Sequence, residues 1–587
     1  MTTGNTGKAP SAAFDEGAAG GASRPREVTQ HFATLVAAWN DRVQHEPDAP
    51  ALVYFDTTLT VRETDDLADA LAAAFADRGV GHGERVGIHL QNIPQYALVL
   101  LALWKLGAIA LLLNPMYRGR ELRELVSDAE PVGIITTDRD MRQVREDVEG
   151  TAVGWVLGTA ESDLQSRNDP RVFKHETTAA TEVSADHRAD APNADLLTLA
   201  HEYTGRKPPS VQVHGDDLAF LAYTSGTTGP PKGAMNSHAN VRAVTTSFAE
   251  LAGITPGDVV YALAPLFHIT GAVVIGALAL TERTSLVFTG RFTTDVAVDA
   301  LREHGVTYTI GSITAFNAMM NSDYATAEHF STVKTLYSGG APVPPSTVAR
   351  FQERFGHYIH NAYGMTETSS AVTAVPPGTS APVDPDSGTL SIGLPLPGVN
   401  VEVVDPEGDT LPRGSQGELV VTGSQVIRGY WRKTKESETA LPEGRLRTGD
   451  SAIVDEAGWV YLVDRIKDQI NVSGYKVWPR EVEDILYQHA AVFEAAVIGL
   501  PDEYRGESVA AYVSLKDGHS AQTDELVSFA RDRLAPYKRP RVVRIVAELP
   551  KTQTGKIRRR TLREQHWTSP THDEGAGDTS RSGPNVG

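Results

Sequence analysis

The chain has 587 residues and no cysteine, which excludes disulfide bonds, thiolate metal sites and a cysteine nucleophile. Its 74 Asp and Glu residues outnumber 54 Lys and Arg residues, and the formal net charge of −20 argues against non-specific nucleic-acid binding, which needs a basic face. A chain of this length exceeds one compact core, so we expect at least two domains.

The N-terminal segment, residues 1–27, is small and polar and lacks the apolar stretch of a signal peptide. We expect a disordered tail there and a second one at residues 566–587, which are similar in composition. The most apolar run, YALVLLALWKLGAIALLLNP at 96–115, is divided by Lys105 and Gly107. Each half is too short to cross a bilayer, so we expect a buried helix followed by a buried strand at 109–113. These features predict a cytoplasmic protein without an integral membrane segment.

Residues 159–215 are polar and weakly patterned, and we expect an extended surface insertion there. From 216 to 365 strand-like and helix-like segments alternate, which favours parallel sheets covered by helices. The expected strands are 218–223, 259–266, 306–310, 333–337 and 358–362, and the expected helices are 238–251, 294–303 and 344–355. The loops SGTTG, LFHITG, SGGAP and GMTE follow these strands, at the sheet edge where such folds bind ligands.

After Asp464 the pattern changes to a smaller unit with helices near 480–488 and 524–534 and strands near 495–499, 508–515 and 541–547. The predicted fold is α/β: a large N-terminal domain of helix-covered, mostly parallel β-sheets over 28–463, and a small mobile α+β domain over 464–565.

The loop in YTSGTTGPPKGAM, residues 223–235, combines glycines, hydroxyl side chains and one lysine directly after an apolar strand. Glycines let backbone N–H groups approach anionic oxygens, and hydroxyl groups and an ammonium add further donors. The segment therefore predicts a phosphate-binding loop, although the lysine spacing differs from the Walker pattern.

Six motifs together resemble the AMP-forming acyl-CoA synthetases of the adenylate-forming superfamily, in the order found in that family. They are TSGTTGPPKG (224–233), YSGGAPV (337–343), NAYGMTET (361–368), RTGD (447–450), DRIKDQINVSGYKVWPREVE (464–483) and PKTQTGKI (550–557). The similarity covers roughly residues 30–565. It implies an acid–thiol ligase that uses ATP, Mg²⁺ and coenzyme A.

The resemblance also implies roles for individual residues. The phosphate loop would comprise Thr224, Ser225, Gly226, Thr227, Thr228, Gly229 and Lys232, and the AMP site Gly340, Ala341, Asn361, Ala362, Tyr363 and Gly364. Tyr363 would stack on the base, and Thr366 would hydrogen-bond the α-phosphate. Glu367 would hold Mg²⁺, and Asp450, assisted by Arg465, would accept the ribose hydroxyls.

Four residues of the small domain complete the implied set. Lys556 would stabilise charge on the α-phosphate and the substrate carboxylate during adenylation. Lys467 occupies the hinge position, Gly474 would line the pantetheine tunnel, and Lys476 would contact phosphate in one of two domain arrangements. A basic run, KIRRR, begins at Lys556, so a solvated face is the alternative reading of that lysine.

His268, in PLFHITG, stands at the position beside the acyl pocket, where it would orient the carboxylate, and a packed core histidine is the alternative. His357 and His360 lack a third metal ligand nearby and are interpreted as strand residues. No G-x-S-x-G motif supports a serine hydrolase.

The predicted function is ATP-dependent activation of a carboxylic acid to acyl-AMP, followed by transfer to coenzyme A. VSGYKVWPREVE most resembles medium- and long-chain fatty-acyl ligases, and 309–320 would line the acyl pocket. The alternatives are an aryl or phenylpropanoid ligase, a stand-alone adenylating domain, a luciferase-type oxygenase and a nucleotide-binding sensor. The expected partners are small molecules, without nucleic acid, and a homodimer is left open.

Overall fold

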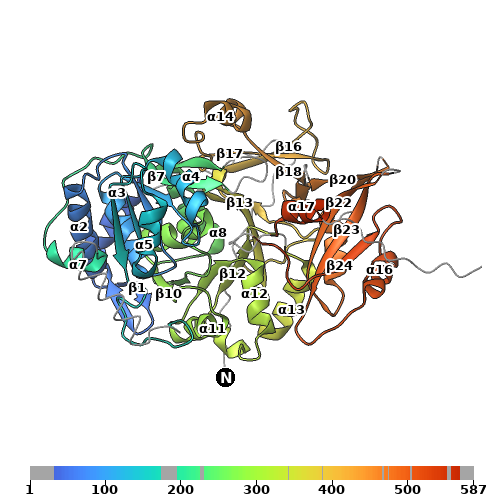
Figure 1. The fold of residues 1–587 in the computed structure, drawn as a ribbon, viewed down its shortest axis with the longest axis horizontal. Coiled ribbons are helices and arrows are strands. Elements are labelled where there is room, and N and C mark those ends of the chain that lie inside the picture. The colour runs from blue at the N-terminus through green and yellow to red at the C-terminus, as the bar shows by residue number, and fades with distance from the viewer. Residues whose placement is uncertain are drawn as a thin grey trace, which may run out of the picture.

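The computed structural model describes residues 32–173, 195–224, 231–341, 343–385, 388–465, 468–473, 475–502, 505–551 and 557–568. Two mostly parallel sheets and their helices form the bulk of the molecule, shown from blue to yellow-green in Figure 1. A four-stranded antiparallel sheet follows, and a small C-terminal unit lies at the opposite end from α2 and α3.

The nine-stranded sheet is parallel in its centre and antiparallel at both edges. Its strands, in spatial order, are β15 (Leu394–Pro395), β14 (Ser370–Ala374), β13 (Ile359–Met365), β12 (Thr335–Gly339), β11 (Tyr308–Gly311), β9 (Val259–Tyr261), β10 (Ser285–Phe288), β1 (Pro50–Tyr54) and β2 (Thr57–Thr60).

The six-stranded sheet repeats this plan with one antiparallel edge strand. Its order is β6 (Trp155–Thr159), β5 (Gly133–Thr137), β3 (Arg85–His89), β4 (Ile109–Leu112), β7 (Leu218–Thr224) and β8 (Lys232–Ser237).

Helices lie between these two sheets, because the largest buried cluster joins their apolar side chains to residues of both. These elements are α1 (Leu35–His45), α2 (Val61–Asp77), α3 (Pro94–Lys105), α8 (His238–Ala252) and a continuous run of α9 (Ile269–Gly271), the π-helix η2 (Ala272–Ala277) and α10 (Leu278–Thr281). Pro94 begins α3, and its next ten residues are all buried, so the apolar run near residue 100 forms a core helix as predicted. No helix within the described ranges is long and apolar enough to cross a membrane.

The large part has further helices and short helical turns in the described ranges. They are α4 (Gly119–Ala129), α5 (Asp138–Asp147), α7 (Leu196–Glu202), α11 (Thr294–Glu303), α12 (Ile313–Asn321), η3 (Ala327–Phe330), α13 (Pro345–Phe355), η4 (Thr366–Thr368), α14 (Thr434–Ala440) and η5 (Pro442–Gly444).

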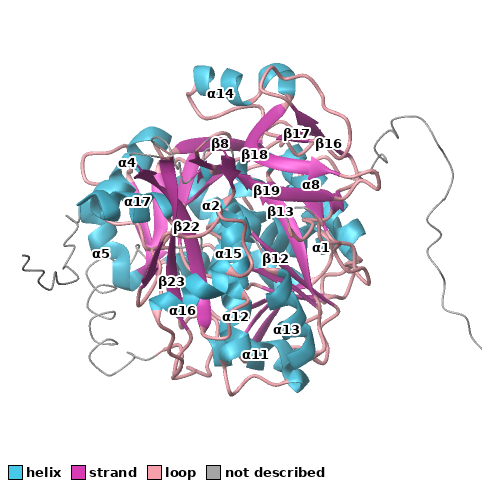
Figure 2. Cartoon of the chain, turned by 90° about the vertical axis from the view of Figure 1, so that its right-hand side faces the viewer, coloured by secondary structure: helices cyan, strands magenta, loops and turns pink. Residues whose placement is uncertain are grey.

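The four-stranded sheet runs in sequence order through β16 (Val399–Val404), β17 (Gln416–Gly423), β18 (Leu446–Val454) and β19 (Val460–Arg465). The C-terminal unit has a five-stranded sheet of β21 (Tyr475–Val477), β20 (Ile470–Val472), β23 (Gly506–Leu515), β22 (Val492–Asp502) and β24 (Val542–Ile545). Around it lie α15 (Pro479–Tyr487), α16 (Thr523–Arg531) and α17 (Arg559–Thr568), as Figure 2 shows. Arg480 of α15 donates a hydrogen bond to the Leu462 carbonyl of β19 at 2.9 Å, which joins the unit to the four-stranded sheet.

The predicted α/β class is confirmed, and the helix at 294–303 is found with the predicted bounds. Two expectations were wrong in extent. The strand expected over 259–266 ends at Tyr261, because the Leu263 amide bonds back to the Tyr261 carbonyl at 2.9 Å and turns the chain. The segment expected as an extended insertion over 159–215 contains α7, whose end is attached to α2 by a hydrogen bond from the Tyr203 hydroxyl to Asp77 at 2.7 Å.

Candidate active site

The described residues predicted to bind phosphate and metal, Thr224, Lys232, Thr366 and Glu367, lie at two hairpins, one in each mostly parallel sheet. In both sheets a strand with a parallel neighbour, β7 or β13, is followed by an antiparallel strand, β8 or β14. Thr224 pairs with Lys232 across the first hairpin, and Met365 pairs with Ser370 across the second. Ser225, Gly226, Thr227, Thr228 and Gly229 lie outside the described residues, so the structure describes only the flanks of the phosphate loop.

Lys232 is the cation of the first hairpin, and it is half-buried. Its Nζ lies 5.0 Å from the ring centre of Tyr430. Tyr430 belongs to a segment that extends the hairpin, since its backbone bridges Ala234 and the next amide, Trp431, bonds the Gly233 carbonyl at 2.7 Å. An aromatic face attracts an ammonium, so this contact fixes the lysine beside the loop.

Glu367 is the carboxylate of the second hairpin and lies in η4 with 9% of its surface exposed. Its Oε1 accepts a hydrogen bond from the Tyr430 hydroxyl at 2.8 Å. Burial, and then the charge of Glu367, raise the pKa of Tyr430 well above its usual value, so the hydroxyl remains a donor at neutral pH. One tyrosine therefore contacts the predicted phosphate-binding lysine and the predicted magnesium ligand.

The backbone around Glu367 is held in a strained conformation. Ser369 and Ser370 have φ of 51° and 101°, which residues with a side chain seldom adopt. Asn236 of β8 stabilises the turn, because its Nδ2 donates to the Thr366 carbonyl at 3.0 Å and to Ser369 Oγ at 2.9 Å. The Thr366 hydroxyl is half-buried and makes no hydrogen bond within the described part of the chain.

Gly364 allows the two strands of this hairpin to approach. A Cβ on Gly364 would lie 1.7 Å from the Ser370 carbonyl oxygen, which is backbone and cannot move aside. A glycine is therefore required here for packing, next to the predicted nucleotide contacts.

The predicted adenine pocket is formed by neighbouring strands. Gly340 and Ala341 follow β12, and Asn361 and Ala362 lie on β13, with Gly339 paired to Ala362. Gly340 has φ of +79°, which glycine adopts without strain. The Asn361 side chain is buried and donates to the Ser391 carbonyl at 3.3 Å.

Tyr363 and Asp450 connect this pocket to the four-stranded sheet. The Tyr363 hydroxyl donates to Asp450 Oδ2 at 2.7 Å. A carboxylate has about four acceptor sites, so this bond is compatible with ribose hydroxyls as further donors. Across the ladder from Asp450 lies the backbone of Arg465, the predicted assistant.

His268 is half-buried after β9 and caps α9, where its Nδ1 accepts from the Thr270 amide at 3.4 Å. The π-helix η2 begins four residues later, and such segments often mark functional sites. His360 is buried and bonds the Leu336 carbonyl through Nδ1 at 3.1 Å, as expected of a packed strand residue. No group of three or more His, Cys, Asp or Glu side chains in the described ranges could hold a metal ion.

The small domain is less completely described. Lys476 lies exposed on β21, and no contact within the described residues joins it to the hairpins. Lys467, Gly474 and Lys556 lie outside the described residues, as do the side-chain contacts of Arg465.

Sequence analysis missed Tyr430 and Asn236. Tyr430 contacts Glu367 from 63 positions away, and Asn236 reaches Ser369 from 133 positions away. The adjacent aromatic residues in RGYW were the available signal for Tyr430, but no local pattern indicated its partners.

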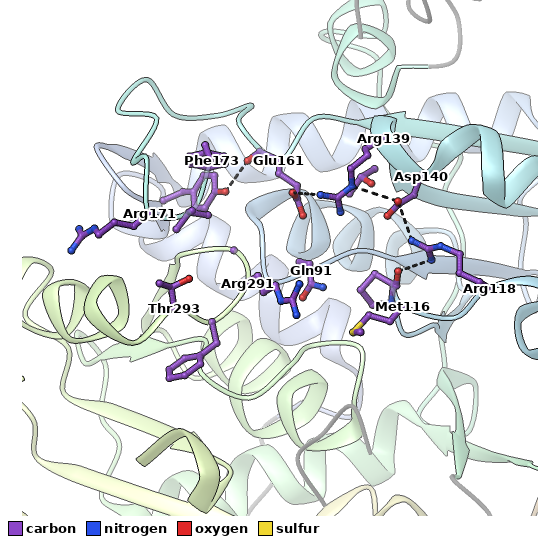
Figure 3. A pocket seen from close by; sticks show the side chains of 16 residues that line it. Gln91, Met116, Arg118, Arg139, Asp140, Glu161, Arg171, Phe173, Arg291 and Thr293 are labelled. Carbon is purple, nitrogen blue, oxygen red and sulfur yellow. Dashed lines mark hydrogen bonds and ion pairs between the residues drawn. The ribbon is translucent and has the colours of Figure 1, made fainter. Parts of the chain in front are cut away.

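A separate cavity of about 580 Å³ lies at the carboxyl ends of β3 and β5, facing the loop after β10 (Figure 3). Its arginines are largely paired by nearby acids. Arg118 lies 3.0 Å from Asp140, and Arg139 lies 3.8 Å from Glu161. None of the predicted site residues lines this cavity.

Comparison with known proteins agrees with this arrangement. Residues 39–431 match the AMP-binding enzyme family, and residues 481–556 match the AMP-binding enzyme C-terminal domain. A long-chain-fatty-acid–CoA ligase of Escherichia coli is 34% identical over 553 residues, covering 92% of this chain and 96% of the relative. The ligase of the same name from Bacillus subtilis is 32% identical over 551 residues, covering 92% and 96%.

The solved structure of ATP-bound MatB from Rhodopseudomonas palustris superposes with a TM-score of 0.78 at 27% identity, covering 91% of this chain and 99% of MatB. Family signatures, relatives and fold agree over nearly the whole described chain. The chain therefore belongs to the family of AMP-forming acyl-CoA synthetases.

Proposed function

We propose that this synthetase activates a long-chain fatty acid with ATP and transfers the acyl group to coenzyme A. The observation that carries the proposal is the convergence of Lys232, Glu367 and the Tyr363–Asp450 pair, which come from three sheets. The chain length of the acid rests on the relatives, whose names state long-chain fatty acids.

In the first step the substrate carboxylate attacks the α-phosphate of ATP, giving acyl-AMP and pyrophosphate. Residues 224–229 and Lys232 hold the β- and γ-phosphates, and the Thr366 hydroxyl donates to the α-phosphate. The base lies against Tyr363 among Gly340, Ala341, Asn361, Ala362 and Gly364, and Asp450 with Arg465 accepts the ribose. His268 orients the substrate carboxylate. Positioning and electrostatics supply the rate enhancement, so no covalent enzyme intermediate is needed.

Glu367 is suited to Mg²⁺, because a hard cation prefers a carboxylate oxygen together with substrate phosphates. Its carboxylate accepts one hydrogen bond, from Tyr430, and no other described group donates to it. The ion would neutralise phosphate charge when bound. A site built by one carboxylate and the nucleotide also agrees with the lack of a multi-ligand cluster in the described ranges.

We assign the large domain to 28–463, the small domain to 464–565 and tails to 1–27 and 566–587. Lys556 of the small domain stabilises charge in adenylation. Rotation about Lys467 then removes Lys556 and brings Gly474 to the tunnel for the coenzyme A thiol, while Lys476 contacts phosphate in one arrangement. Residues 309–320, which form β11 and α12, line the acyl pocket.

The test is pyrophosphate release from MgATP with saturated acids of two to eighteen carbons, benzoate and cinnamate, followed by thioester detection with coenzyme A. We expect the highest kcat/KM with the long chains. Preference for an aromatic acid would replace the substrate assignment, and ADP instead of AMP as product would contradict the mechanism.

A further inference from the structure

The two charged groups assigned to phosphate and metal, Lys232 and Glu367, share Tyr430 as a contact and form no ion pair with each other in the described structure. Within the described part of the chain no ion pair includes either residue, although both contact Tyr430. Resting on the proposed function, we infer that Tyr430 is a positioning residue for the metal-dependent step, which orients the Glu367 carboxylate and keeps the Lys232 ammonium apart from it.

A tyrosine suits this place because its two parts recognise opposite charges. The ring face is negative and attracts the Lys232 ammonium at 5.0 Å, whereas the hydroxyl donates to Glu367 Oε1 at 2.8 Å. A direct Lys232–Glu367 pair would neutralise both groups, and the incoming triphosphate and metal would have to separate them. Tyr430 binds each charge more weakly than the substrate would: its ring attracts Lys232 less strongly than a phosphate does, and its hydroxyl binds Glu367 less strongly than Mg²⁺ does.

The position of Tyr430 is fixed from both hairpins. Its side chain is 6% exposed, and its amide donates to Ser437 Oγ at 2.8 Å. On one side the Trp431 amide bonds the Gly233 carbonyl of the β7–β8 hairpin at 2.7 Å. On the other side the Ile427 amide bonds the Glu367 carbonyl at 2.9 Å. Segment 427–431 therefore connects the β7–β8 hairpin with the turn at Glu367, and Tyr430 lies within this connecting segment.

This geometry predicts a specific effect on metal use. The Tyr430 hydroxyl occupies one acceptor site of Oε1, and no other described group donates to the carboxylate. Removing the hydroxyl lets the carboxylate rotate. Partners that orient a metal ligand typically change metal affinity or activity by about 10- to 100-fold when they are lost.

The primary test is Tyr430→Phe, assayed by pyrophosphate release at fixed ATP across a magnesium titration. We expect the Mg²⁺ concentration for half-maximal rate to rise about 10-fold or more. At saturating Mg²⁺ we expect kcat to return to within about 3-fold of the parent enzyme, since the ring and the Lys232 contact remain. An unchanged magnesium requirement overturns the inference.

Tyr461→Phe is the matched control. Tyr461 is equally buried at 5% exposed, and its hydroxyl donates to the Asp455 carboxylate at 3.0 Å, away from the predicted site residues. We expect a normal magnesium titration for this variant. If both variants shift it equally, the effect is a general loss of stability and the inference fails. The parent enzyme assayed in parallel distinguishes this result from failure of the proposed function, in which no pyrophosphate is released.

A double-mutant cycle tests whether Tyr430 acts through Glu367. In a Glu367→Gln background, Tyr430→Phe should change kcat/KM by less than about 2-fold, because the group it orients is gone. Multiplicative losses in the double variant would overturn the inference. Tyr430→Leu, which also removes the ring, should raise the KM for ATP beyond that of Tyr430→Phe, and equal KM values would contradict the role of the ring toward Lys232.

Discussion

The β7–β8 and β13–β14 hairpins have the same strand arrangement but differ in what positions the charged residue of each. The β13–β14 turn places Glu367 through left-handed residues, a required glycine and a buried asparagine. At the β7–β8 hairpin the charged residue, Lys232, is the first residue of the regular strand β8, and its ammonium lies over the ring of Tyr430. The backbone that carries the carboxylate is thus fixed by left-handed residues, Gly364 and Asn236. The cation is instead positioned by the ring of Tyr430, whose hydroxyl also bonds the carboxylate. Backbone substitutions should therefore affect folding more at the β13–β14 hairpin than at the β7–β8 hairpin, where the loss of Lys232 should affect catalysis.

The largest expected effect is the loss of adenylation when Lys556 is replaced, which would show that the two hairpins do not support adenylation without the small domain. Lys556→Ala should reduce adenylation by about 100- to 1,000-fold, by analogy with the loss of one donor to a developing oxyanion. Thioester formation from supplied acyl-AMP should stay within about 3-fold. Single-turnover assays of each half-reaction check this, and equal losses in both would remove Lys556 from the adenylating arrangement.

A pair of glycine substitutions compares the two hairpins directly. Gly364→Ala should lower the free energy of unfolding by about 3 kcal/mol, because the new Cβ meets fixed backbone at 1.7 Å. Gly233→Ala in the other hairpin should cost about 1 kcal/mol, since its nearest atoms are side chains at 3.0–3.3 Å. Urea unfolding measures the free energy of unfolding of both variants. Equal losses would contradict the conclusion that the β13–β14 hairpin is the more tightly packed of the two.

Lys232→Met tests the cation of the β7–β8 hairpin. Loss of a hydrogen bond to a charged group is worth about 1.5–3 kcal/mol, so kcat/KM for ATP should fall about 10- to 100-fold. The unfolding midpoint should be nearly unchanged, because among the described residues the lysine side chain contacts a ring face and forms no ion pair. A variant with normal ATP kinetics would place the phosphate contact elsewhere.

Acid should weaken the six-stranded half of the molecule. Burial lowers the pKa of His89 and of His238 to about 4. The folded state binds these protons less well than the unfolded chain, so the stability is fully present above about pH 6.5 and is lost as the pH falls toward 4. Between pH 7.5 and 5 each histidine should lower the free energy of unfolding by about 2 kcal/mol. His238→Gln should reduce this loss in denaturant titrations at several pH values, and an unchanged slope would contradict the assignment.

The smallest effect concerns the connection between β13 and the four-stranded sheet. Tyr363→Phe removes the hydrogen bond to Asp450 at 2.7 Å but keeps the ring. A net loss of about 1 kcal/mol corresponds to an approximately 5-fold rise in the KM for ATP. The KM for dATP should rise as well as the KM for ATP, because the lost hydrogen bond joins two protein groups and the base contact is retained.

Elements with strong local signals could be predicted from sequence. The apolar run at α3 and β4 and the periodic helix α11 appear where expected, because burial and caps act within a few residues. The predicted strand at β9 was too long, because the amino-acid composition gives no signal for the backbone turn at Leu263. Tyr430 was missed for another reason: its partners lie on other sheets, and only the folded chain brings them together.

The register of the four-stranded sheet has a mechanical consequence. Arg465, the last residue of β19, lies across the ladder from Asp450, and the segment to the small domain begins directly after it. The proposed rotation about Lys467 would therefore have its axis beside the predicted ribose contacts of Asp450 and Arg465. Under that proposal the predicted contacts with AMP would change little between the two half-reactions, whereas the part of the small domain farthest from Arg465 would move the greatest distance.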